Sequence, residues 1–220
     1  LYNNFSFING KKLLICVSGG VDTMVLLKIL KTLNYNVSVA HCNFKLRGIE
    51  SDADCDFVKQ YCNLNKIDFY TKEFDTSVPK YSVQMSARKL RYEWFYHLLH
   101  VNDFDYIVTA HHLDDSLETF LINLSRSTGI DGLRGIKSIN DKVIRPLLIF
   151  NKSDIIQYAN LNKLEWREDS SNKKNDYLRN KIRNTIIPEL KDLNPGFLNN
   201  FSKTLNFIND DACIIEDYVS

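Results

Sequence analysis

Two patterns of apolar and polar positions alternate along the first 150 residues: short continuous apolar runs, and longer segments with apolar residues at helical spacing. The first run, residues 11–17 (KKLLICV), predicts a buried strand, and residues 23–33 (TMVLLKILKTL) predict a helix ended by Asn34. Further strands are predicted at 36–44, 66–74 and 105–110, and a short fifth strand at 143–148, where Pro146 indicates an edge or an end. Further helices are predicted from Ser51, at about 83–101 and at 112–126.

This alternation predicts an α/β fold in which helices cover both faces of a mostly parallel sheet. We expect a doubly wound sheet of five strands in the order 3-2-1-4-5, with a ligand crevice at the carboxyl ends of the first and fourth strands. From residue 151 the pattern is helical and more polar, with Pro188 and Pro195. We therefore expect an α/β domain over 1–150, a helical extension packed on it over 151–195, and a helix or linker over 196–220 toward further parts.

The segment SGGVDT (18–23) joins the first predicted strand to the first predicted helix. Adjacent glycines let backbone N–H groups converge on an anion, and the helix N-terminus adds its dipole. The hydroxyls of Ser18 and Thr23 suit phosphate oxygens, whereas Asp22 would repel phosphate unless a cation such as Mg²⁺ lies between them. The spacing fits neither a Walker loop nor G-x-G-x-x-G, and it resembles the phosphate loop of PP-loop ATP pyrophosphatases. A glycine-rich turn without a ligand is the alternative.

A second polar segment, TAHHLDDSLET (109–119), begins where the fourth predicted strand ends. In the expected sheet, the carboxylates of Asp114 and Asp115 would face the glycine loop across the crevice and suit Mg²⁺ held by ATP phosphates. The alternative is that these acids, with Glu118, only favour the start of a helix. His111 and His112 fit phosphate contact and simple capping equally well.

Composition narrows the class of protein. The net charge of +1 excludes a polybasic protein, although residues 172–184 (NKKNDYLRNKIRN) hold five Lys or Arg and one Asp. No apolar stretch approaches the roughly 20 residues of a membrane helix, and no signal peptide is recognisable, so we expect no membrane association. The five cysteines are scattered without a C-x-x-C pair, which is typical of thiols in a reducing cytoplasm.

Beyond SGGVDT, five further segments carry a closer resemblance: AHCNFKLRGIESDAD (40–54), SARKLRYEWF (86–95), TAHHLDDSLETFLINLSRSTGIDGLRGI (109–136), IRPLL (144–148) and EDSSNKKNDYLRNKIRNTIIPEL (168–190). Together they resemble the successive motifs of the bacterial tRNA(Ile)-lysidine synthase family, within the PP-loop, or N-type, ATP pyrophosphatase superfamily. The resemblance covers about residues 11–196. It implies an adenine nucleotide alpha hydrolase-like fold and an ATP-dependent ligase in the cytoplasm.

The implied reaction has two steps. ATP adenylates O2 of the wobble cytidine, position 34, of a tRNA(Ile) with a CAU anticodon, and pyrophosphate leaves. An amine of free L-lysine then attacks C2 and displaces AMP, which leaves lysidine. The resemblance leaves a homodimer open.

The resemblance also implies roles for individual residues. The ATP phosphates would be held by Ser18, Gly19, Gly20, Val21, Asp22 and Thr23, and the rest of the nucleotide would lie beside Ala40, His41, Asn43 and His112. Asp22 with Asp114 or Asp115 would hold Mg²⁺, and Arg88 would join them in catalysis. The tRNA would face Arg126, Arg145, Arg179, Asn180 and Arg183. Arg88 and Arg145 suit either a phosphate or the carboxylate of the lysine substrate.

Two departures from the family pattern are visible. Thr23 stands where many members have Ser, which keeps the hydroxyl. Members usually carry C-terminal domains that help grip tRNA, so we expect this chain to bind ATP better than tRNA.

Three other functions stay open. A tRNA thiolase of the same superfamily commonly needs paired cysteines, which this chain lacks. A GMP or NAD synthetase would not need the basic stretch at 172–184. The alternative for that stretch is a solvated helix face without a ligand. A non-catalytic nucleotide-binding module would not need both Asp22 and the Asp114–Asp115 pair.

Overall fold

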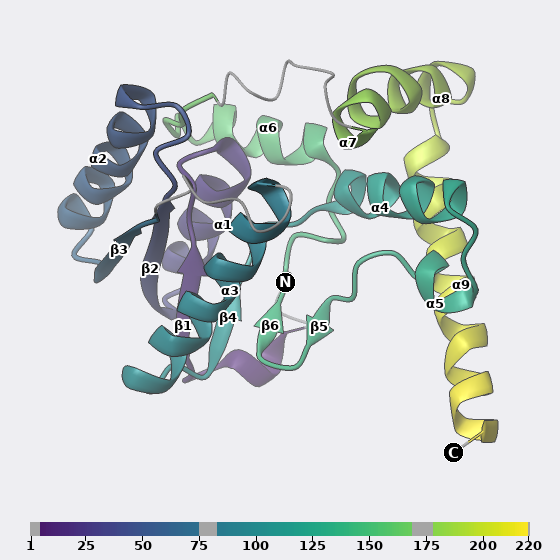
Figure 1. Cartoon of the computed structure of the whole chain (residues 1–220), viewed down its shortest axis with the longest axis horizontal. Coiled ribbons are helices and arrows are strands. Elements are labelled where there is room, and N and C mark those ends of the chain that lie inside the picture. Colours follow the sequence, from purple (N-terminus) through teal and green to yellow (C-terminus); the bar gives the residue numbers. More distant parts are fainter. Residues whose placement is uncertain (1–4, 75–82, 169–177, 220) are drawn as a thin grey trace. The chain divides into compact units, whose positions relative to one another are not determined.

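The computed structural model describes residues 5–74, 83–168 and 178–219 (Figure 1). The chain divides into two compact units. The first comprises Leu1–Ala110, Ile139–Pro146 and Ile156–Glu168, and the second comprises His111–Ser138, Leu147–Ile155 and Asp169–Ser220. The units interleave along the sequence. The expected α/β domain over 1–150, helical extension over 151–195 and helix or linker over 196–220 stay predictions.

The first unit is built on a six-stranded sheet in the order β3-β2-β1-β4-β6-β5. Its strands are β1 (Lys12–Cys16), β2 (Asn36–Asn43), β3 (Phe69–Glu73), β4 (Tyr106–Val108), β5 (Ile139–Asn140) and β6 (Val143–Ile144). All neighbours pair in parallel except β5 and β6. Because β1 lies between β2 and β4, the predicted doubly wound order around the first strand is confirmed.

One predicted feature of the sheet needs correction, since five strands were expected. The segment predicted as the fifth strand at 143–148 contains β6, and β5 precedes it as an antiparallel partner across Asp141 and Lys142. Asp141 adopts a left-handed conformation with φ 51°, which a two-residue hairpin turn requires. Ile139–Asn140 escaped prediction because two residues show no periodicity.

Both faces of this sheet are covered. Alternation along the strands sends Leu14, Ala40 and Ile107 to one face, where they form a core with Trp94 and Phe95 of α3 (Val83–Val101). On the other face, Leu13, Ile15 and Val39 are fully buried, and α1 (Val21–Thr32) and α2 (Ile49–Leu64) contact β2. The continuous apolar runs thus form a sheet buried on both sides.

The start of α2 also differs from the prediction. The helix was expected to open at Ser51, but it begins at Ile49 with Gly48 as its N-cap, at φ 54° and ψ −122°. The Ser51 hydroxyl instead accepts a hydrogen bond from the N–H of Arg47 at 3.2 Å. The tight turn at Gly48 therefore starts the helix earlier than its acids and apolar residues indicate.

The second unit is helical. It contains α4 (Leu113–Ser125), α5 (Ile130–Leu133), α7 (Leu178–Lys181), a π-type turn at Ile182–Ile186, α8 (Ile187–Leu193) and α9 (Phe197–Val219). Its core joins Leu113 and Leu117 of α4 to Ile182, Ile187 and Phe201. The residues of α6 (Lys152–Leu161) belong to the first unit from Ile156 on. None of the helices in the described ranges has the length and apolar character that a membrane span requires.

Candidate functional site

The predicted phosphate loop lies between the carboxyl end of β1 and the first turn of α1. Gly20 is the N-cap of α1 with φ −72° and ψ 161°, so Val21, Asp22 and Thr23 form the first turn of the helix. The Ser18 hydroxyl accepts the N–H of Gly20 at 3.3 Å and lies 3.4 Å from the Thr23 hydroxyl, which donates to the Gly20 carbonyl at 2.9 Å. Two hydroxyls and a helix N-terminus thus meet at one place, as an anion site requires.

Gly19 explains the need for a glycine in this loop. Its φ of 93° is one that side chains rarely adopt, and a Cβ there would lie 3.4 Å from the Val58 side chain and 3.6 Å from that of Phe57. The loop therefore passes directly over α2 within the first unit. A residue with a side chain would be strained by this φ, while its Cβ would make ordinary van der Waals contact with that helix.

The predicted adenosine-side residues lie at the carboxyl end of β2, the strand beside β1. His41 is buried, and its Nδ1 is 2.9 Å from the Val17 carbonyl. Burial lowers the pKa of His41, so the neutral ring with a proton on Nδ1 donates to Val17. Asn43 donates to Asp52 at 2.8 Å and accepts the N–H of Lys45 at 2.9 Å. These contacts fix the end of β2 beside the segment that enters the loop.

The two predicted arginines of the first unit lie in different surroundings. Arg88 is exposed on α3, and its guanidinium lies over the Tyr92 ring, 5.0 Å from the centroid. Arg145 follows β6 directly and is 6% exposed. Arg145 is therefore buried at the end of a strand and not exposed on the surface. Its contact with RNA stays a prediction.

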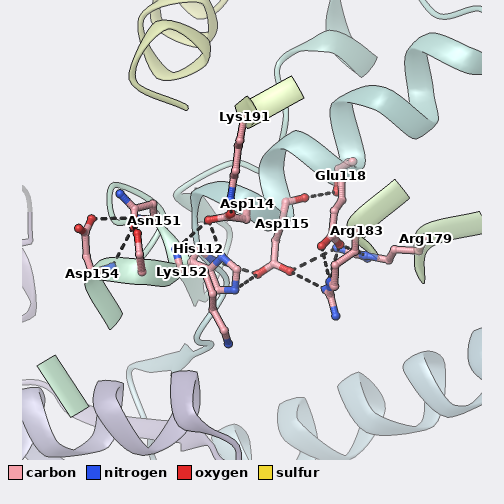
Figure 2. A network of polar contacts seen from close by, with 12 residues as sticks. His112, Asp114, Asp115, Glu118, Asn151, Lys152, Asp154, Arg179, Arg183 and Lys191 are labelled. Atoms are coloured by element: carbon pink, nitrogen blue, oxygen red, sulfur yellow. Dashed lines mark hydrogen bonds and ion pairs between the residues drawn. The ribbon is translucent and has the colours of Figure 1, made fainter. Parts of the chain in front are cut away.

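A second cluster lies at the N-terminus of α4, in the second unit (Figure 2). His112 is the N-cap, and its N–H donates to the Asp115 carboxylate at 3.0 Å. Asp114 accepts the N–H of Lys152 at 2.8 Å and pairs with the Lys191 ammonium at 2.7 Å. The His112 ring lies between the two acids, 3.6 Å from the Asp114 carboxylate and 3.5 Å from that of Asp115.

The pKa values of the two carboxyls follow from these contacts. Burial alone would raise the pKa of Asp114, but His112, Lys191 and the N–H of Lys152 outweigh it and hold that pKa well below its usual range. Burial also opposes ionisation of Asp115, whose pKa His112 nevertheless lowers, with help from His111 and Arg179. Both carboxylates are thus ionised at neutral pH.

Three residues of the predicted tRNA-facing set lie close to this cluster or on its helix. Arg179 and Arg183 both bind Glu118, with Nε–oxygen distances of 2.7 and 2.5 Å, and Glu118 is 1% exposed. Figure 2 shows the two guanidiniums on one side of α4. Arg126 is exposed and forms the C-cap of α4.

Asn180, the remaining residue predicted to face the tRNA from this unit, is half-buried on α7. Residues 172–177 of the basic stretch lie outside the described residues.

Sequence reasoning missed several partners in these clusters. Lys191 and Lys152 were not singled out, and Glu118 was read only as a helix-start acid. The sequence holds one signal for this partnership. Arg179 and Arg183 are four positions apart, so on a helix they share one face and can bind the same acid, here Glu118. Asp54, Arg47 and Arg167, which meet beside the phosphate loop, were also missed.

A nucleotide-borne Mg²⁺ needs only one or two protein carboxylates. Asp22 fits this need, since it lies in the first turn of α1, two residues after the cap Gly20. Asp114 and Asp115 are already compensated by basic groups, and within the described ranges no three His, Cys, Asp or Glu side chains are grouped as a metal site. Asp22 thus fits as a ligand of a Mg²⁺ ion that arrives bound to the ATP phosphates. That Asp114 or Asp115 also binds this ion stays a prediction.

Three curated tRNA(Ile)-lysidine synthases are similar over most of the chain. That of Bacteroides thetaiotaomicron is 42% identical over 94% of this chain and 50% of the relative. That of Chlorobaculum tepidum is 40% identical over 96% of this chain and 65% of the relative. That of Bacillus subtilis is 34% identical over 95% of this chain and 47% of the relative. The chain thus spans about half the length of most curated relatives that it matches.

A solved structure shares the fold. A U34-tRNA thiolase from Methanococcus maripaludis, with its [4Fe-4S] cluster, has a TM-score of 0.71 at 18% identity, over 89% of this chain and 73% of that one. At this identity the likeness concerns the fold alone. A family model described as a PP-loop domain matches residues 1–190, which include both the Ser18–Thr23 loop and the His112–Glu118 segment. The chain belongs to the PP-loop domain family.

Proposed function

We propose that this chain is the ATP-binding and catalytic part of a tRNA(Ile)-lysidine synthase. It uses ATP to adenylate O2 of the wobble cytidine, position 34, in tRNA(Ile) with a CAU anticodon. An amine of free L-lysine then forms a bond to C2, and the C2–O bond to AMP breaks. The products are lysidine in the tRNA, AMP and pyrophosphate.

One observation carries the proposal: 40–42% identity to two curated tRNA(Ile)-lysidine synthases over at least 94% of the chain. The loop geometry supports it independently. Pyrophosphate is a good leaving group only when its charge is compensated, and the Ser18–Thr23 loop offers backbone N–H groups, two hydroxyls and a helix N-terminus. Such a loop stabilises the phosphates as the bond to the α-phosphorus breaks.

Base recognition is proposed for the end of β2. Ala40, His41 and Asn43 lie on the strand next to β1, and the hydrogen bonds of His41 and Asn43 hold that edge rigid. A rigid edge beside the loop orients the adenosine and brings its α-phosphate to the reacting cytidine. Arg88 and Arg145 are proposed to bind a phosphate or the carboxylate of lysine.

We assign magnesium to the phosphates and Asp22. The ion would neutralise phosphate charge and polarise the bond that breaks. Asp22 lies at the mouth of the loop and is half-buried, outside the core of the first unit. Replacing it should therefore change chemistry and not folding.

The Asp22→Ala variant should lose ATP turnover by about a hundredfold or more and keep the circular-dichroism spectrum and melting temperature of the unmodified chain. ATP turnover is measured as pyrophosphate release. A variant with full turnover would contradict the assignment of Asp22 to magnesium.

RNA recognition is proposed for the second unit. Arg126, Arg179, Asn180 and Arg183 supply donors for phosphate and for unstacked bases, as single-stranded loops of RNA require. The proposed setting is the cytoplasm, where tRNA, ATP and free lysine are all present. A homodimer stays a prediction.

The test is the identity of the modified nucleoside. Unmodified tRNA(Ile) with a CAU anticodon is incubated with the protein, ATP, Mg²⁺ and lysine, digested to nucleosides and analysed by mass spectrometry. Lysidine in place of one cytidine is the expected product. Thiolated nucleoside formed only with a sulfur donor would move the protein to the thiolases, and an unchanged nucleoside pool with nucleotide still bound would indicate a binding module.

A further inference from the structure

The segment RGIESDAD (47–54) matches the family pattern but has no role in the function proposed so far. Its last residue, Asp54, lies in the second turn of α2 and is 7% exposed. One carboxylate oxygen accepts from the Arg47 guanidinium at 2.6 Å, and the other accepts from Nε of Arg167. One buried acid thus holds two arginines that lie 120 positions apart in the sequence.

The same residues meet at the phosphate loop. The N–H of Arg167 donates to the Gly19 carbonyl at 3.0 Å. On the other side, a Cβ at Gly19 would lie 3.8 Å from the Asp54 carbonyl and 3.4 Å from the Val58 side chain. Gly19 is therefore held between the backbone of Arg167 and the second turn of α2.

The planarity of the peptide bond gives this contact a consequence for phosphate binding. In a trans peptide the C=O and the following N–H point in opposite directions. Since the Gly19 carbonyl points at Arg167, the Gly20 N–H points to the other side, where it meets the Ser18 hydroxyl at 3.3 Å. If this peptide turned over, a carbonyl oxygen would replace an N–H in the anion site and would repel phosphate.

The ion pairs fix Arg167 in this position. A backbone hydrogen bond in a segment without helix or strand structure is weak alone, and residues 164–168 have neither. The link to Asp54 anchors the side chain of the same residue on α2. Arg47 takes the second carboxylate oxygen and also lies 3.5 Å from Glu50, which balances its charge.

We propose that Asp54 is a positioning residue for the ATP phosphates: through Arg167 it locks the Gly19–Gly20 peptide so that the Gly20 N–H faces the phosphate side of the loop. The inference rests on the proposed ATP-binding function and deepens it. Both carboxylate oxygens of Asp54 bind arginines and are not offered to the nucleotide. Asp54 acts through Arg167 on the orientation of one peptide group.

The decisive experiment compares Asp54→Asn with Asp56→Asn. Asp56 lies on the same helix and is exposed, so its variant makes the same chemical change away from the loop. Binding of ATP and of adenosine is measured by titration calorimetry, together with the melting temperature. Adenosine separates a role in phosphate binding from a merely structural role, because it lacks the phosphates that the loop is proposed to hold.

Asp54→Asn should bind ATP about tenfold or more weakly, whereas its affinity for adenosine and both affinities of Asp56→Asn should stay within about twofold of the unmodified chain. Equal loss of ATP and adenosine binding would show a merely structural role and overturn the proposal. Unchanged ATP binding in Asp54→Asn would overturn it as well. Failure of the unmodified chain to bind ATP would instead refute the proposed function, and this inference with it.

A second variant covers the case in which Asp54→Asn does not fold. Arg167→Lys keeps the positive charge and the backbone N–H but loses the planar guanidinium that donates through Nε. Asp54 keeps Arg47 as a partner in this variant, so the core stays compensated. ATP affinity should fall by about tenfold with adenosine affinity unchanged, and an ATP affinity equal to that of the unmodified chain would contradict the role of Arg167.

Discussion

Individual carboxylates in this chain show how a buried charge is stabilised. Asp114 is 7% exposed, yet the ammonium of Lys191 and the N–H of Lys152 keep it ionised. Glu118, at 1% exposure, is held by two guanidiniums. Removing one partner from such a pair leaves a charge without compensation, which is far less favourable than losing the whole pair. Asp114 therefore connects the stability of the second unit to pH, and Glu118 connects it to the charges of its two arginines.

The pH dependence of stability follows from Asp114. Its pKa in the folded chain is well below the ordinary value, so its contribution is fully present above the unfolded pKa of about 3.9 and is lost as the pH falls toward the folded value. The Asp114→Asn variant should be less stable than the unmodified chain at pH 6. The difference should shrink below about pH 4. Urea unfolding from pH 3 to 7 measures this, and a difference independent of pH would contradict it.

One variant can separate the ion pair of Arg179 with Glu118 from its proposed role in RNA binding. Arg183 still holds Glu118 when Arg179 is removed. Because the Arg179 side chain is 42% exposed, solvent screens its pair, so Arg179→Ala should reduce stability by only about 1 kcal/mol. If Arg179 also faces the RNA, tRNA affinity should fall by about tenfold with ATP affinity unchanged.

The control for Arg179→Ala is Lys181→Ala, which removes a charge from the exposed Lys181 on the same short helix. Filter binding at fixed salt measures tRNA affinity. Equal loss of tRNA and ATP binding in Arg179→Ala would show that Arg179 only supports the fold of the second unit.

Among the structural elements, the turn between β1 and α1 needs a backbone conformation that side chains rarely adopt. Gly19 and Gly10 both have positive φ, 93° and 72°, but a Cβ at Gly10 has no atom within 4 Å. Gly19→Ala and Gly10→Ala should both lose about 1 kcal/mol of stability through backbone strain. Only Gly19→Ala should weaken ATP binding, by about tenfold. Calorimetric titration with ATP tests this, and equal affinities in the two variants would contradict the assignment of the loop.

Elements with strong local patterns could be predicted from the sequence, and those set by tertiary contacts could not. The apolar run at 11–17 and the glycines behind it gave β1 and the loop, because burial on both faces and backbone freedom are local demands. The hairpin partner β5 and the early start of α2 at Ile49 depend on single turns at Asp141 and Gly48. The link of Arg167 to Asp54 spans 113 positions, which no local pattern encodes.

At the scale of the whole molecule, the residues predicted to act in function are divided between the two compact units. Ser18–Thr23 and the end of β2 belong to the first, and the His112–Glu118 cluster with Arg179 and Arg183 belongs to the second. The sequence alone could assign both groups of motifs to one function, since a single family carries them all. The partners of each acid, such as Lys191 for Asp114, came only from the fold.

The central claim is that the release of AMP from ATP requires both tRNA and lysine. The most direct measurement is AMP release from ATP in four reactions: with tRNA(Ile) carrying a CAU anticodon and lysine, with each alone, and with neither. The account predicts AMP only when both are present, with one lysine entering the RNA for each AMP released. AMP formed at the same rate without lysine, or without tRNA, would contradict it.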